Sequence, residues 1–277
     1  MSTWIREDAK RKKSWIQSLC ESVLKSGYVP KHVAVIMDGN RRYADKNNYK
    51  RSVGHLLGFN KVTETLEWCM GLGINEVTLY AFSLENFKRS KEEIDGLMEL
   101  ARQKFTALLA EKELISKHGL CLRIIGNMDY LPIDIQQLFA EGIHSTKDNN
   151  KAFLNICCAY TSREEMTNTM VQIVRGVSKG LIKQSDIDED LFEKCLYTRH
   201  STEPDLVIRT SGEVRLSDFL LWQSSYSFLS FTKVLWPEYS WCHFYSGIYY
   251  FQRNYQAIKV GWLVGWLSSR LIGWLSG

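Results

Sequence analysis

The stretch VAVIMDGNRRYADK, from Val33 to Lys46, decides the fold that we expect for this chain. Five of its first six residues are apolar, as in a strand that is buried on both faces of a parallel sheet. An acid, a glycine, an amide and two arginines then follow together, as Asp38, Gly39, Asn40, Arg41 and Arg42. The stretch therefore raises the question of why a buried strand should end in one carboxylate beside two guanidiniums.

Five further apolar runs are typical of buried strands. They begin at Glu76, Leu120, Ala152, Pro204 and Phe228, and the last of them, FLSFTKVLW, extends to Trp236. Helical patterns alternate with the runs, which predicts an α/β fold with a mainly parallel six-stranded sheet flanked by helices. Ligands of such sheets bind beyond the carboxyl ends of the strands, which is where Asp38 to Arg42 are expected.

The clearest helical pattern extends from Ser90 to Gly119. Ser90 with Glu93 forms a capping box, and Gly119 supplies a stop at the carboxyl end. A second helix start of the capping type is predicted at Ser162 with Glu165. Apolar residues at helical spacing give the helix from Ser90 one apolar face, which suits either an ordinary core or the wall of an apolar tunnel.

Composition sets broad limits on the function. The 277 residues suit one large or two small domains, with 45% hydrophobic and 24% charged residues. The net charge of +4 is too small to argue for nucleic acid, and it suits anionic substrates or an anionic membrane surface. The seven cysteines are an odd number without C-x-x-C spacing, so reduced thiols are expected rather than disulfides or a zinc site.

Arginines follow three of the predicted strands and would meet at one edge of the sheet. They are accompanied by Gly, Ser, Asn or His residues, in the sets Asp38 to Arg42 with Arg51 and His55, Ser83 to Arg89, and Arg209 to Ser217. Single arginines after strands are commonly solvated loop residues. Three sets together favour a site for an anion such as a phosphate, because guanidinium forks bind phosphate in a bidentate manner.

Asp38 has both a structural and a functional interpretation. It could form a salt bridge with Arg41 or Arg42, or a turn before Gly39. It could also hold Mg²⁺, which often uses one or two carboxylates together with substrate phosphates. The chain has no G-x-x-x-x-G-K-[ST] motif, which disfavours a P-loop protein. Ile36 and Asn40 stand where an aspartyl phosphatase would need a second aspartate, which disfavours a phosphatase of that class.

Four stretches together resemble the cis-prenyltransferase family across residues 15–255. They are HVAVIMDGNRRYA from His32, GHLLGFNKV from Gly54, LYAFSLENFKRSKEEIDGLM from Leu79, and DLVIRTSGEVRLSDFLLWQSSYSFLSFTKVLWPEY from Asp205. The resemblance implies an Mg²⁺-dependent enzyme that adds isopentenyl diphosphate repeatedly to farnesyl diphosphate, with a hydrophobic tunnel for the product. It is strongest to eukaryotic members that make the polyprenyl diphosphate precursor of dolichol for protein glycosylation.

The resemblance also implies roles for individual residues. Asp38 would hold the metal, and Asp38, Asn86 and Arg89 would be catalytic. The allylic diphosphate would be bound by Gly39, Asn40, Arg41, Arg42, Arg51, His55 and Arg89. The isopentenyl diphosphate would be bound by Arg209, Arg215 and Ser217.

Two departures from the family pattern point to a partner. Phe228 stands where bacterial members carry a glutamate that supports the metal. Self-sufficient members end in Arg-x-Gly, whereas this chain has only Arg270-Leu-Ile-Gly after Tyr255. We therefore expect a heteromer in which a non-catalytic homologous subunit supplies the Arg-x-Gly motif. The alternative is that this chain is itself a non-catalytic partner, which the intact set of arginines around Asp38 disfavours.

Both ends of the chain are amphipathic. We expect an amphipathic N-terminal helix in residues 1–29, a catalytic domain in 30–256 and a tryptophan-rich tail in 257–277. The N-terminus is too charged for a secretory signal, and no segment offers the roughly 20 continuous apolar residues of a membrane span. Both ends suit contact with lipid or packing on the domain. The resemblance implies a peripheral enzyme at the cytosolic face of the endoplasmic reticulum membrane and no binding of nucleic acid.

Overall fold

The computed structural model describes residues 13–275, apart from the side chains at positions 112, 114, 258 and 261–275. Its strands are β1 (His32–Ile36), β2 (Glu76–Ser83), β3 (Leu120–Ile125), β4 (Ala152–Tyr160), β5 (Leu206–Arg209) and β6 (Phe228–Phe231). Its α-helices are α1 (Trp15–Lys25), α2 (Asn40–Lys46), α3 (Arg51–Leu72), α4 (Lys91–Ala110), α5 (Lys112–His118), α6 (Ile133–Thr146), α7 (Ser162–Ser178), α8 (Glu189–Cys195) and α9 (Trp241–Leu275). Short 3₁₀ helices are η1 (Leu84–Lys88), η2 (Met128–Tyr130), η3 (Gln184–Asp186) and η4 (Trp236–Glu238).

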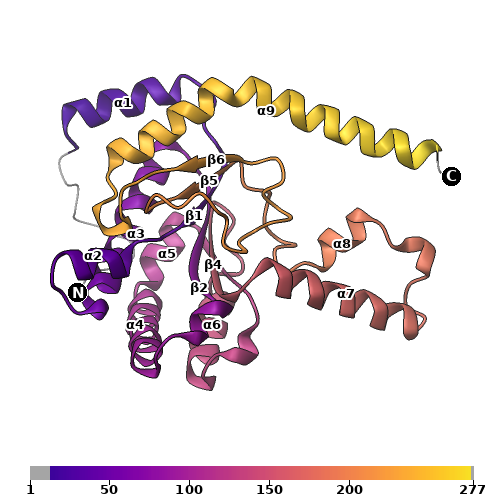
Figure 1. Ribbon diagram of the computed structural model, residues 1–277, viewed down its shortest axis with the longest axis horizontal. Helices are drawn as coiled ribbons and strands as arrows, with labels where there is room; N and C mark the ends of the chain where they lie inside the picture. Colours follow the sequence, from indigo (N-terminus) through magenta and orange to yellow (C-terminus); the bar gives the residue numbers. More distant parts are fainter. Residues whose placement is uncertain (1–12, 276–277) are drawn as a thin grey trace.

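The six strands form one sheet in the order β3-β4-β2-β1-β5-β6, and every pairing is parallel (Figure 1). The predicted α/β fold with six strands is therefore confirmed. Strands β2, β4 and β3 lie on one side of β1, and the chain then crosses to the other side of β1 to add β5 and β6. The direction in which strands are added thus reverses at β1. In open parallel sheets the crevice beside such a reversal is the usual ligand site.

The two faces of the sheet are covered differently. Val33 and Val35 of β1 belong to a large apolar core formed with α1, α3, α4, α6 and α9. Ala34 and Ile36 face a smaller core that includes Phe219 in the loop between β5 and β6. Successive side chains of a strand point to opposite faces, so this division follows from two-sided burial of β1. In Figure 1, α7 and α8 form a hairpin that projects to one side of the body.

Three details differ from the sequence-based predictions. The sixth strand ends at Phe231 rather than Trp236, because the chain turns there and enters η4. The helix predicted to reach Gly119 is interrupted at Glu111, whose φ of −93° and ψ of 33° are not helical. The predicted capping at Ser162 is wrong, because the Oγ of Ser162 accepts from the backbone N–H of Leu221 instead.

The amino ends of the central strands carry a buried polar network. The Nδ2 group of Asn155 donates to Oγ1 of Thr78 over 2.9 Å, and Thr78 lies 2.7 Å from Nε2 of His32. The Nδ1 atom of His32 lies 2.7 Å from the carbonyl oxygen of Thr202. Since that carbonyl can only accept, Nδ1 carries a proton. Burial lowers the pKa of His32, which favours the neutral imidazole.

Helices α1 and α9 lie side by side in Figure 1 and contact each other through polar groups. The hydroxyl of Tyr245 donates to Glu21 over 3.3 Å, and Nε2 of Gln252 donates to the carbonyl oxygen of Leu24 over 2.7 Å. Helix α9 continues without a break past position 257, where the sequence predicted a separate tail. The amphipathic pattern expected at the two ends depends partly on residues 1–12 and on side chains at positions 261–275, which lie outside the described part of the structure.

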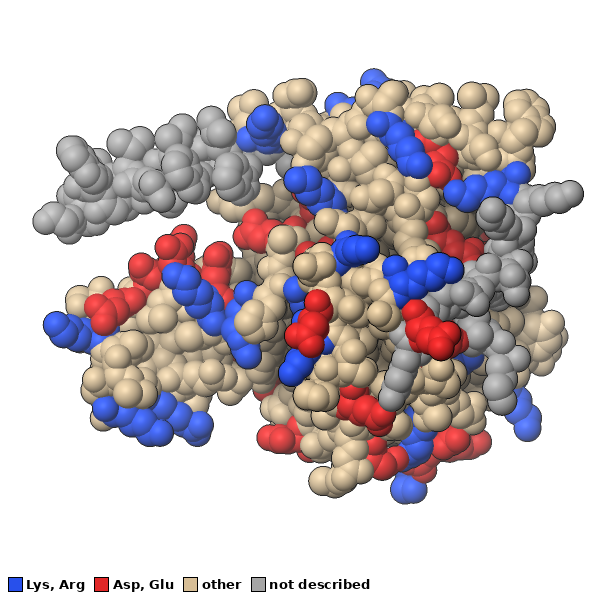
Figure 2. Space-filling model, turned by 180° about the vertical axis from the view of Figure 1, so that it is seen from behind, with Lys and Arg blue, Asp and Glu red and all other residues tan. Residues whose placement is uncertain are grey.

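Within the described residues, no helix combines the length and the hydropathy that crossing a membrane requires. In the view from behind, basic and acidic side chains are mixed over the body of the molecule (Figure 2). Acidic side chains also gather along one edge of the α7–α8 projection in that view.

Candidate active site

The loop after β1 is fixed by its backbone conformation. Gly39 has a φ of 112° and caps the start of α2, and a Cβ atom there would lie 3.0 Å from the Cα of Leu235. Only glycine fits this turn without strain. The carbonyl oxygen of Asp38 accepts from Oγ1 of Thr210 over 2.6 Å and from the N–H of Trp236 over 3.0 Å. The predicted site loop is thus held against the chain segments that follow β5 and β6.

The carboxylate of Asp38 meets a guanidinium from the neighbouring strand. Nη2 of Arg209 lies 2.8 Å from Oδ2 of Asp38, whereas Nη2 of Arg42 lies 3.6 Å from it. Arg209 is the register partner of Ile36 at the end of β1, which explains why it reaches the next loop. Burial opposes ionisation of Asp38, but the hydrogen bond and charge of Arg209 prevail and lower its pKa. The carboxylate at the end of β1 is therefore ionised and paired mainly across the sheet.

Arg209 also organises the loop that follows β5. Its Nη1 group donates to Oγ of Ser217 over 2.6 Å and to the carbonyl oxygen of Arg215. Only 4% of its side chain is exposed, compared with 65% for Arg215. The side chain of Arg215 pairs with Glu213, whose carboxylate is 2.6 Å away. Arg209 and Arg215 are predicted to bind the same diphosphate. In the structure Arg209 is buried and bonded within the protein, whereas Arg215 lines the cleft.

A second carboxylate, that of Glu93 on α4, lies beneath the remaining cationic groups. Its Oε1 atom is 2.8 Å from Nη1 of Arg89, 3.6 Å from Nε2 of His55 and 3.9 Å from Nε of Arg41. Its Oε2 atom is 3.3 Å from Nη1 of Arg51. We refer to Glu93 with Arg41, Arg51, His55 and Arg89 as the Glu93 cluster. Burial opposes ionisation of Glu93, but the charge of Arg89 and the other cations lowers its pKa.

The imidazole of His55 carries less charge than its acidic neighbour would suggest. Burial is the main cause that lowers the pKa of His55, and the charge of Arg89 acts in the same direction. Glu93 opposes both effects without reversing them. His55 is therefore neutral near pH 7 and offers a nitrogen that can accept or donate a hydrogen bond.

A polar cleft of about 390 Å³ collects most of the predicted site residues. Its lining includes Asp38, Gly39, Asn40, Arg41, Arg42, Arg51, His55, Arg89 and Arg215. Arg209 and Ser217 do not line it, but they are bonded to each other and through Arg209 to Asp38. The side chain of Asn86 lies in η1, where Oδ1 accepts from the N–H of Ser83 over 3.0 Å. Asn86 is thus not among the residues that line the cleft.

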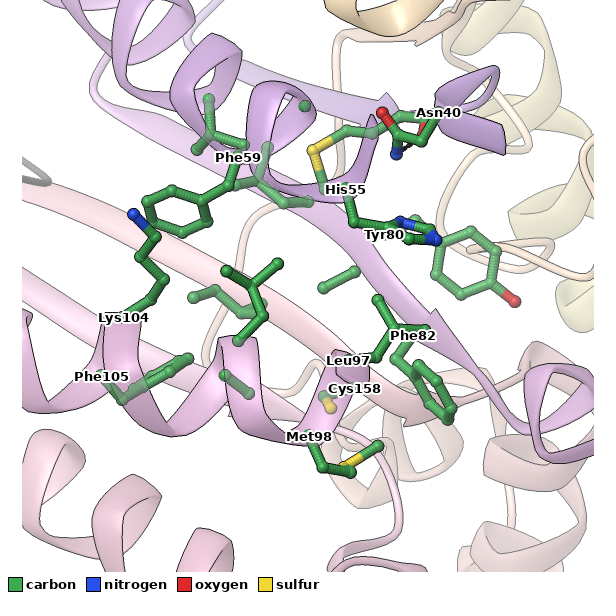
Figure 3. Close-up of a pocket in the computed structure, with 18 of the residues that line it drawn as sticks. Asn40, His55, Phe59, Tyr80, Phe82, Leu97, Met98, Lys104, Phe105 and Cys158 are labelled. Atoms are coloured by element: carbon green, nitrogen blue, oxygen red, sulfur yellow. Dashed lines mark hydrogen bonds between the residues drawn. The ribbon is translucent and has the colours of Figure 1, made fainter. Parts of the chain in front are cut away.

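An apolar cavity of about 150 Å³ adjoins the cleft. It lies between α3, β2 and α4, and Leu97, Met98 and Phe105 contribute the apolar face of α4 to its wall (Figure 3). Asn40 and His55 lie at one end of it, and Phe59 and Lys104 at the other. Met37, Asn40 and His55 line both the cleft and the cavity, so the two spaces share one wall. The α4 face that the sequence offered for a tunnel therefore does line an apolar space.

The common wall is assembled by close packing of α2 against α3. A Cβ atom on Gly54 of α3 would overlap the backbone carbonyl oxygen of Asn40, so glycine is needed for this approach. Oδ1 of Asn40 and Nε2 of His55 are buried and make no hydrogen bond within the described part of the chain. Buried polar atoms are nearly always bonded, so these two atoms indicate a place where a ligand supplies the partner.

Asp38 offers a single carboxylate, so it suits a cation whose other ligands come from substrate and water. The described ion pairs of Asp38 all use Oδ2. Among the residues that the structure describes, no three His, Cys, Asp or Glu side chains gather in a group that could hold a metal. Magnesium is commonly held by one or two carboxylates together with phosphate oxygens and water, so a single ionised aspartate beside an anion site fits it.

Phe228, which stands in place of the bacterial glutamate, lies at the start of β6. It pairs with Leu206, at the opposite end of β5 from Arg209, and its ring packs against Phe251 with centroids 6.2 Å apart. In this chain the position is thus part of the core. Three acidic residues of the site are not assigned to it by the sequence pattern: Asp45 and Glu213, which line the cleft, and Glu93, whose spacing from Ser90 indicates a helix cap. The spacing of Arg89 and Glu93, one helical turn apart, was the available signal for Glu93.

Known proteins resemble this chain over most of its length. The family model for undecaprenyl diphosphate synthase, Prenyltransf, matches residues 36–259. The dehydrodolichyl diphosphate synthase complex subunit DHDDS of Homo sapiens is 54% identical over 257 residues, which cover 93% of this chain and 76% of the human protein. The tritrans,polycis-undecaprenyl-diphosphate synthase (geranylgeranyl-diphosphate specific) of Pyrococcus abyssi is 45% identical over 231 residues, 83% of this chain and 87% of that protein.

A solved structure agrees with these relatives. Lavandulyl diphosphate synthase from Lavandula x intermedia, in complex with dimethylallyl diphosphate, has a TM-score of 0.77 and 31% sequence identity. The match covers 81% of this chain and 95% of the lavender chain. Since the family model spans most of the chain and the fold agrees, the chain belongs to the undecaprenyl diphosphate synthase family and is a cis-prenyltransferase.

Proposed function

We propose that this chain is the catalytic subunit of an enzyme that extends farnesyl diphosphate with isopentenyl diphosphate to dehydrodolichyl diphosphate. The observation that supports it most is the wall shared by the polar cleft and the apolar cavity, formed by Met37, Asn40 and His55. A prenyl diphosphate has an anionic head and an apolar tail, so it needs these two environments side by side. The human relative, which is 54% identical over 257 residues, is named a dehydrodolichyl diphosphate synthase complex subunit.

The two diphosphates divide the cleft between them in this proposal. Gly39, Asn40, Arg41, Arg42, Arg51, His55 and Arg89 bind the allylic diphosphate, and Arg209, Arg215 and Ser217 bind the isopentenyl diphosphate. Guanidiniums that surround a diphosphate provide bidentate, charge-assisted hydrogen bonds. The unpartnered atoms of Asn40 and His55 lie where the head of the allylic substrate would meet its tail. Asn86, in η1 directly after β2, orients the reacting groups in this proposal.

Asp38 holds Mg²⁺ in this proposal, together with oxygens of the substrate diphosphates. When it is bound, Mg²⁺ supplies positive charge that stabilises a departing diphosphate. The lowered pKa of Asp38 keeps its carboxylate ionised and ready to bind a cation. Arg209 fixes the carboxylate at the end of β1 and at the same time holds the loop of Ser217.

The reaction needs no covalent intermediate with the enzyme. The C1–O bond of the allylic diphosphate breaks, and the bonding electrons leave with the diphosphate. The double bond of isopentenyl diphosphate attacks C1, and a proton leaves C2 to restore a double bond. Guanidiniums held around the departing diphosphate favour the transition state over the bound substrate, because the negative charge on that group grows as the bond breaks.

A partner subunit and a membrane surface complete the proposal. A homologous non-catalytic subunit supplies an Arg-x-Gly end to the isopentenyl diphosphate site, in line with the word complex in the human relative's name. Residues 30–256 form the catalytic domain, residues 1–29 and 257–277 flank it, and the enzyme lies on the cytosolic face of the endoplasmic reticulum membrane. The exposed Trp15, Leu19 and Val23 of α1 support contact with lipid.

The test is incorporation of radiolabelled isopentenyl diphosphate into lipid, with farnesyl diphosphate and Mg²⁺, by this chain with its partner subunit. The wild-type complex should form labelled polyprenyl diphosphate, and Asp38→Ala should abolish the product while leaving the fold intact by circular dichroism. A wild-type complex that binds both substrates and forms no product would contradict the proposal and favour a non-catalytic binding subunit.

A further inference from the structure

The Glu93 cluster contains more positive groups than one carboxylate neutralises. Three guanidiniums lie within 4.0 Å of the Glu93 carboxylate, and the neutral imidazole of His55 lies beside them at 3.6 Å. Its side chain is 7% exposed, whereas those of Arg41 and Arg51 are 49% and 53% exposed. The carboxylate thus forms the buried base of the cluster, and two of the guanidiniums extend from it toward solvent.

We propose that Glu93 is a positioning residue, an internal counter-ion that aligns the guanidiniums of Arg41, Arg51 and Arg89 for the departing diphosphate. Glu93 does not line the polar cleft, whereas all three arginines and His55 do. Glu93 therefore acts through them rather than on the substrate. This inference rests on the proposed function, because it assigns the aligned guanidiniums to the diphosphate of a prenyl substrate.

Alignment is needed because like charges separate when nothing holds them together. Guanidiniums of Arg41, Arg51 and Arg89 come from α2, from the start of α3 and from the turn before α4, so no single element fixes them. Each arginine side chain has several rotatable bonds, and mutual repulsion favours rotamers that point into solvent. A shared buried carboxylate selects the rotamers that converge. The transition state is then met by donors that are already in place.

The position of Glu93 in the first turn of α4 fixes the place from which its carboxylate reaches the arginines. Oγ of Ser90 accepts from the N–H of Glu93 over 3.4 Å, which fixes the backbone of that turn. The side chain is therefore directed by the helix start, and it does not depend on a flexible loop. Glu92, the next residue on the same turn, is exposed and supplies a matched control with the same chemistry.

The experiment compares Glu93→Gln, Glu93→Asp and Glu92→Gln in the complex with the partner subunit. Calorimetry measures the Kd of inorganic pyrophosphate in Mg²⁺ buffer, steady-state kinetics gives kcat and KM for farnesyl diphosphate, and thermal unfolding gives Tm. Glu93→Gln should lower kcat by about tenfold or more, because misaligned donors lose transition-state contacts. The Kd of pyrophosphate should stay within about threefold or become tighter, because the cleft loses a negative charge.

Glu93→Asp keeps the charge on a shorter side chain, so its kcat should fall between those of the wild type and Glu93→Gln. Glu92→Gln should stay within about twofold of the wild type in every measurement, as is usual for exposed positions. A Glu93→Gln complex with kcat within twofold of the wild type would overturn the inference. So would a tenfold weaker pyrophosphate affinity, because Glu93 would then support binding or folding rather than alignment.

Two further outcomes separate this inference from the proposed function. If Glu93→Gln fails to fold, the Glu93→Asp variant tests the inference in its place. A kcat of Glu93→Asp equal to that of the wild type would overturn the inference. A reduced kcat with an unchanged Kd of pyrophosphate would support it. If the wild-type complex transfers no prenyl group, the proposed function fails by itself. The pyrophosphate affinities of the same variants then test the counter-ion role, which requires that the Kd of Glu93→Gln stay within about threefold of the wild-type Kd or become tighter.

Discussion

At the scale of single residues, Arg209 and Arg215 show how similar side chains take different roles. Arg209 ends β5 and Arg215 lies six residues later, and both are assigned to the proposed isopentenyl diphosphate site. The first is 4% exposed and bonded to Asp38 and Ser217, and the second is 65% exposed and bonded to Glu213. Their substitution should therefore affect different properties of the enzyme.

Arg215→Ala should impair use of isopentenyl diphosphate without unfolding the protein. Loss of one charge-assisted fork should raise the KM for isopentenyl diphosphate by about tenfold or more, with a smaller change for farnesyl diphosphate. Steady-state kinetics with each substrate varied in turn measures both constants. An unchanged KM for isopentenyl diphosphate with intact kcat would contradict the assignment of Arg215.

Arg209→Ala should instead destabilise the fold. It leaves Asp38 without its 2.8 Å partner and releases the loop of Ser217. Breaking a fully buried ion pair costs about 3–5 kcal/mol, and the partial exposure of Asp38 reduces the expected loss to about 2 kcal/mol. Urea unfolding measures this loss, with Arg215→Ala as the control that should stay within about 0.5 kcal/mol of the wild type. Equal stability of both variants would contradict the structural role of Arg209.

At the scale of elements, the amino ends of the strands hold a histidine that titrates differently in the folded and unfolded chain. Burial is the main cause that lowers the pKa of His32, although the nearby Glu76 opposes it. The unfolded chain therefore binds this proton more readily than the folded chain. The contribution to stability is complete above the unfolded pKa, near 6.5, and is lost as the pH falls below it.

The free energy of unfolding should thus fall with a slope of up to about 1.4 kcal/mol per pH unit below about pH 6.5 on account of His32. Chemical unfolding of the wild type and His32→Gln at a series of pH values measures the slope that the substitution removes. His144→Gln, on the exposed part of α6, is the control and should keep the wild-type slope. A wild-type slope in His32→Gln would show that other groups cause the acid sensitivity.

The elements also show how far sequence reasoning reaches. All six strands could be predicted because each coincides with a mainly apolar run, which burial on both faces explains for the central strands β1 and β5. The end of β6 and the break at Glu111 could not, because no proline or glycine in the sequence marks either place. The cleft could be predicted from arginines at strand ends. The role of Glu93 could not, because a capping box and a buried ion cluster use the same residue types.

Helix α1 carries a prediction about the membrane. Trp15, Leu19 and Val23 are 75%, 56% and 62% exposed, whereas Glu21 and Leu24 face the protein. Replacing the three exposed residues with serine should reduce sedimentation of the complex with vesicles of phosphatidylcholine and phosphatidylserine by at least about fivefold, because apolar burial drives such binding. The Tm should not change, because these side chains leave the core untouched.

The control for this experiment lies on the projecting hairpin. Met170, Val174 and Leu181 are also exposed, at 57%, 65% and 75%, and serine at all three should leave vesicle binding unchanged. Equal loss in both triple variants would indicate unspecific hydrophobic adsorption and would contradict a lipid-facing role for α1.

At the scale of the whole molecule, the proposed complex predicts that this chain alone is a poor enzyme. Loss of one preorganised donor typically lowers kcat by 10²–10³, so the isolated chain should turn over at least about a hundredfold more slowly than the complex. Radiolabel incorporation by the purified chain with and without the homologous subunit measures the ratio. Comparable turnover without the subunit would contradict the need for a second arginine-bearing end.

The wall that the cleft and the cavity have in common has a consequence for processivity. Every cycle lengthens the hydrocarbon by one five-carbon unit while the reacting head must return to the same anchoring point. The tail therefore advances past Asn40 and His55 by a fixed step, and each step removes more hydrocarbon from water. Escape of the intermediate becomes slower as it grows, so short polymers should rarely leave.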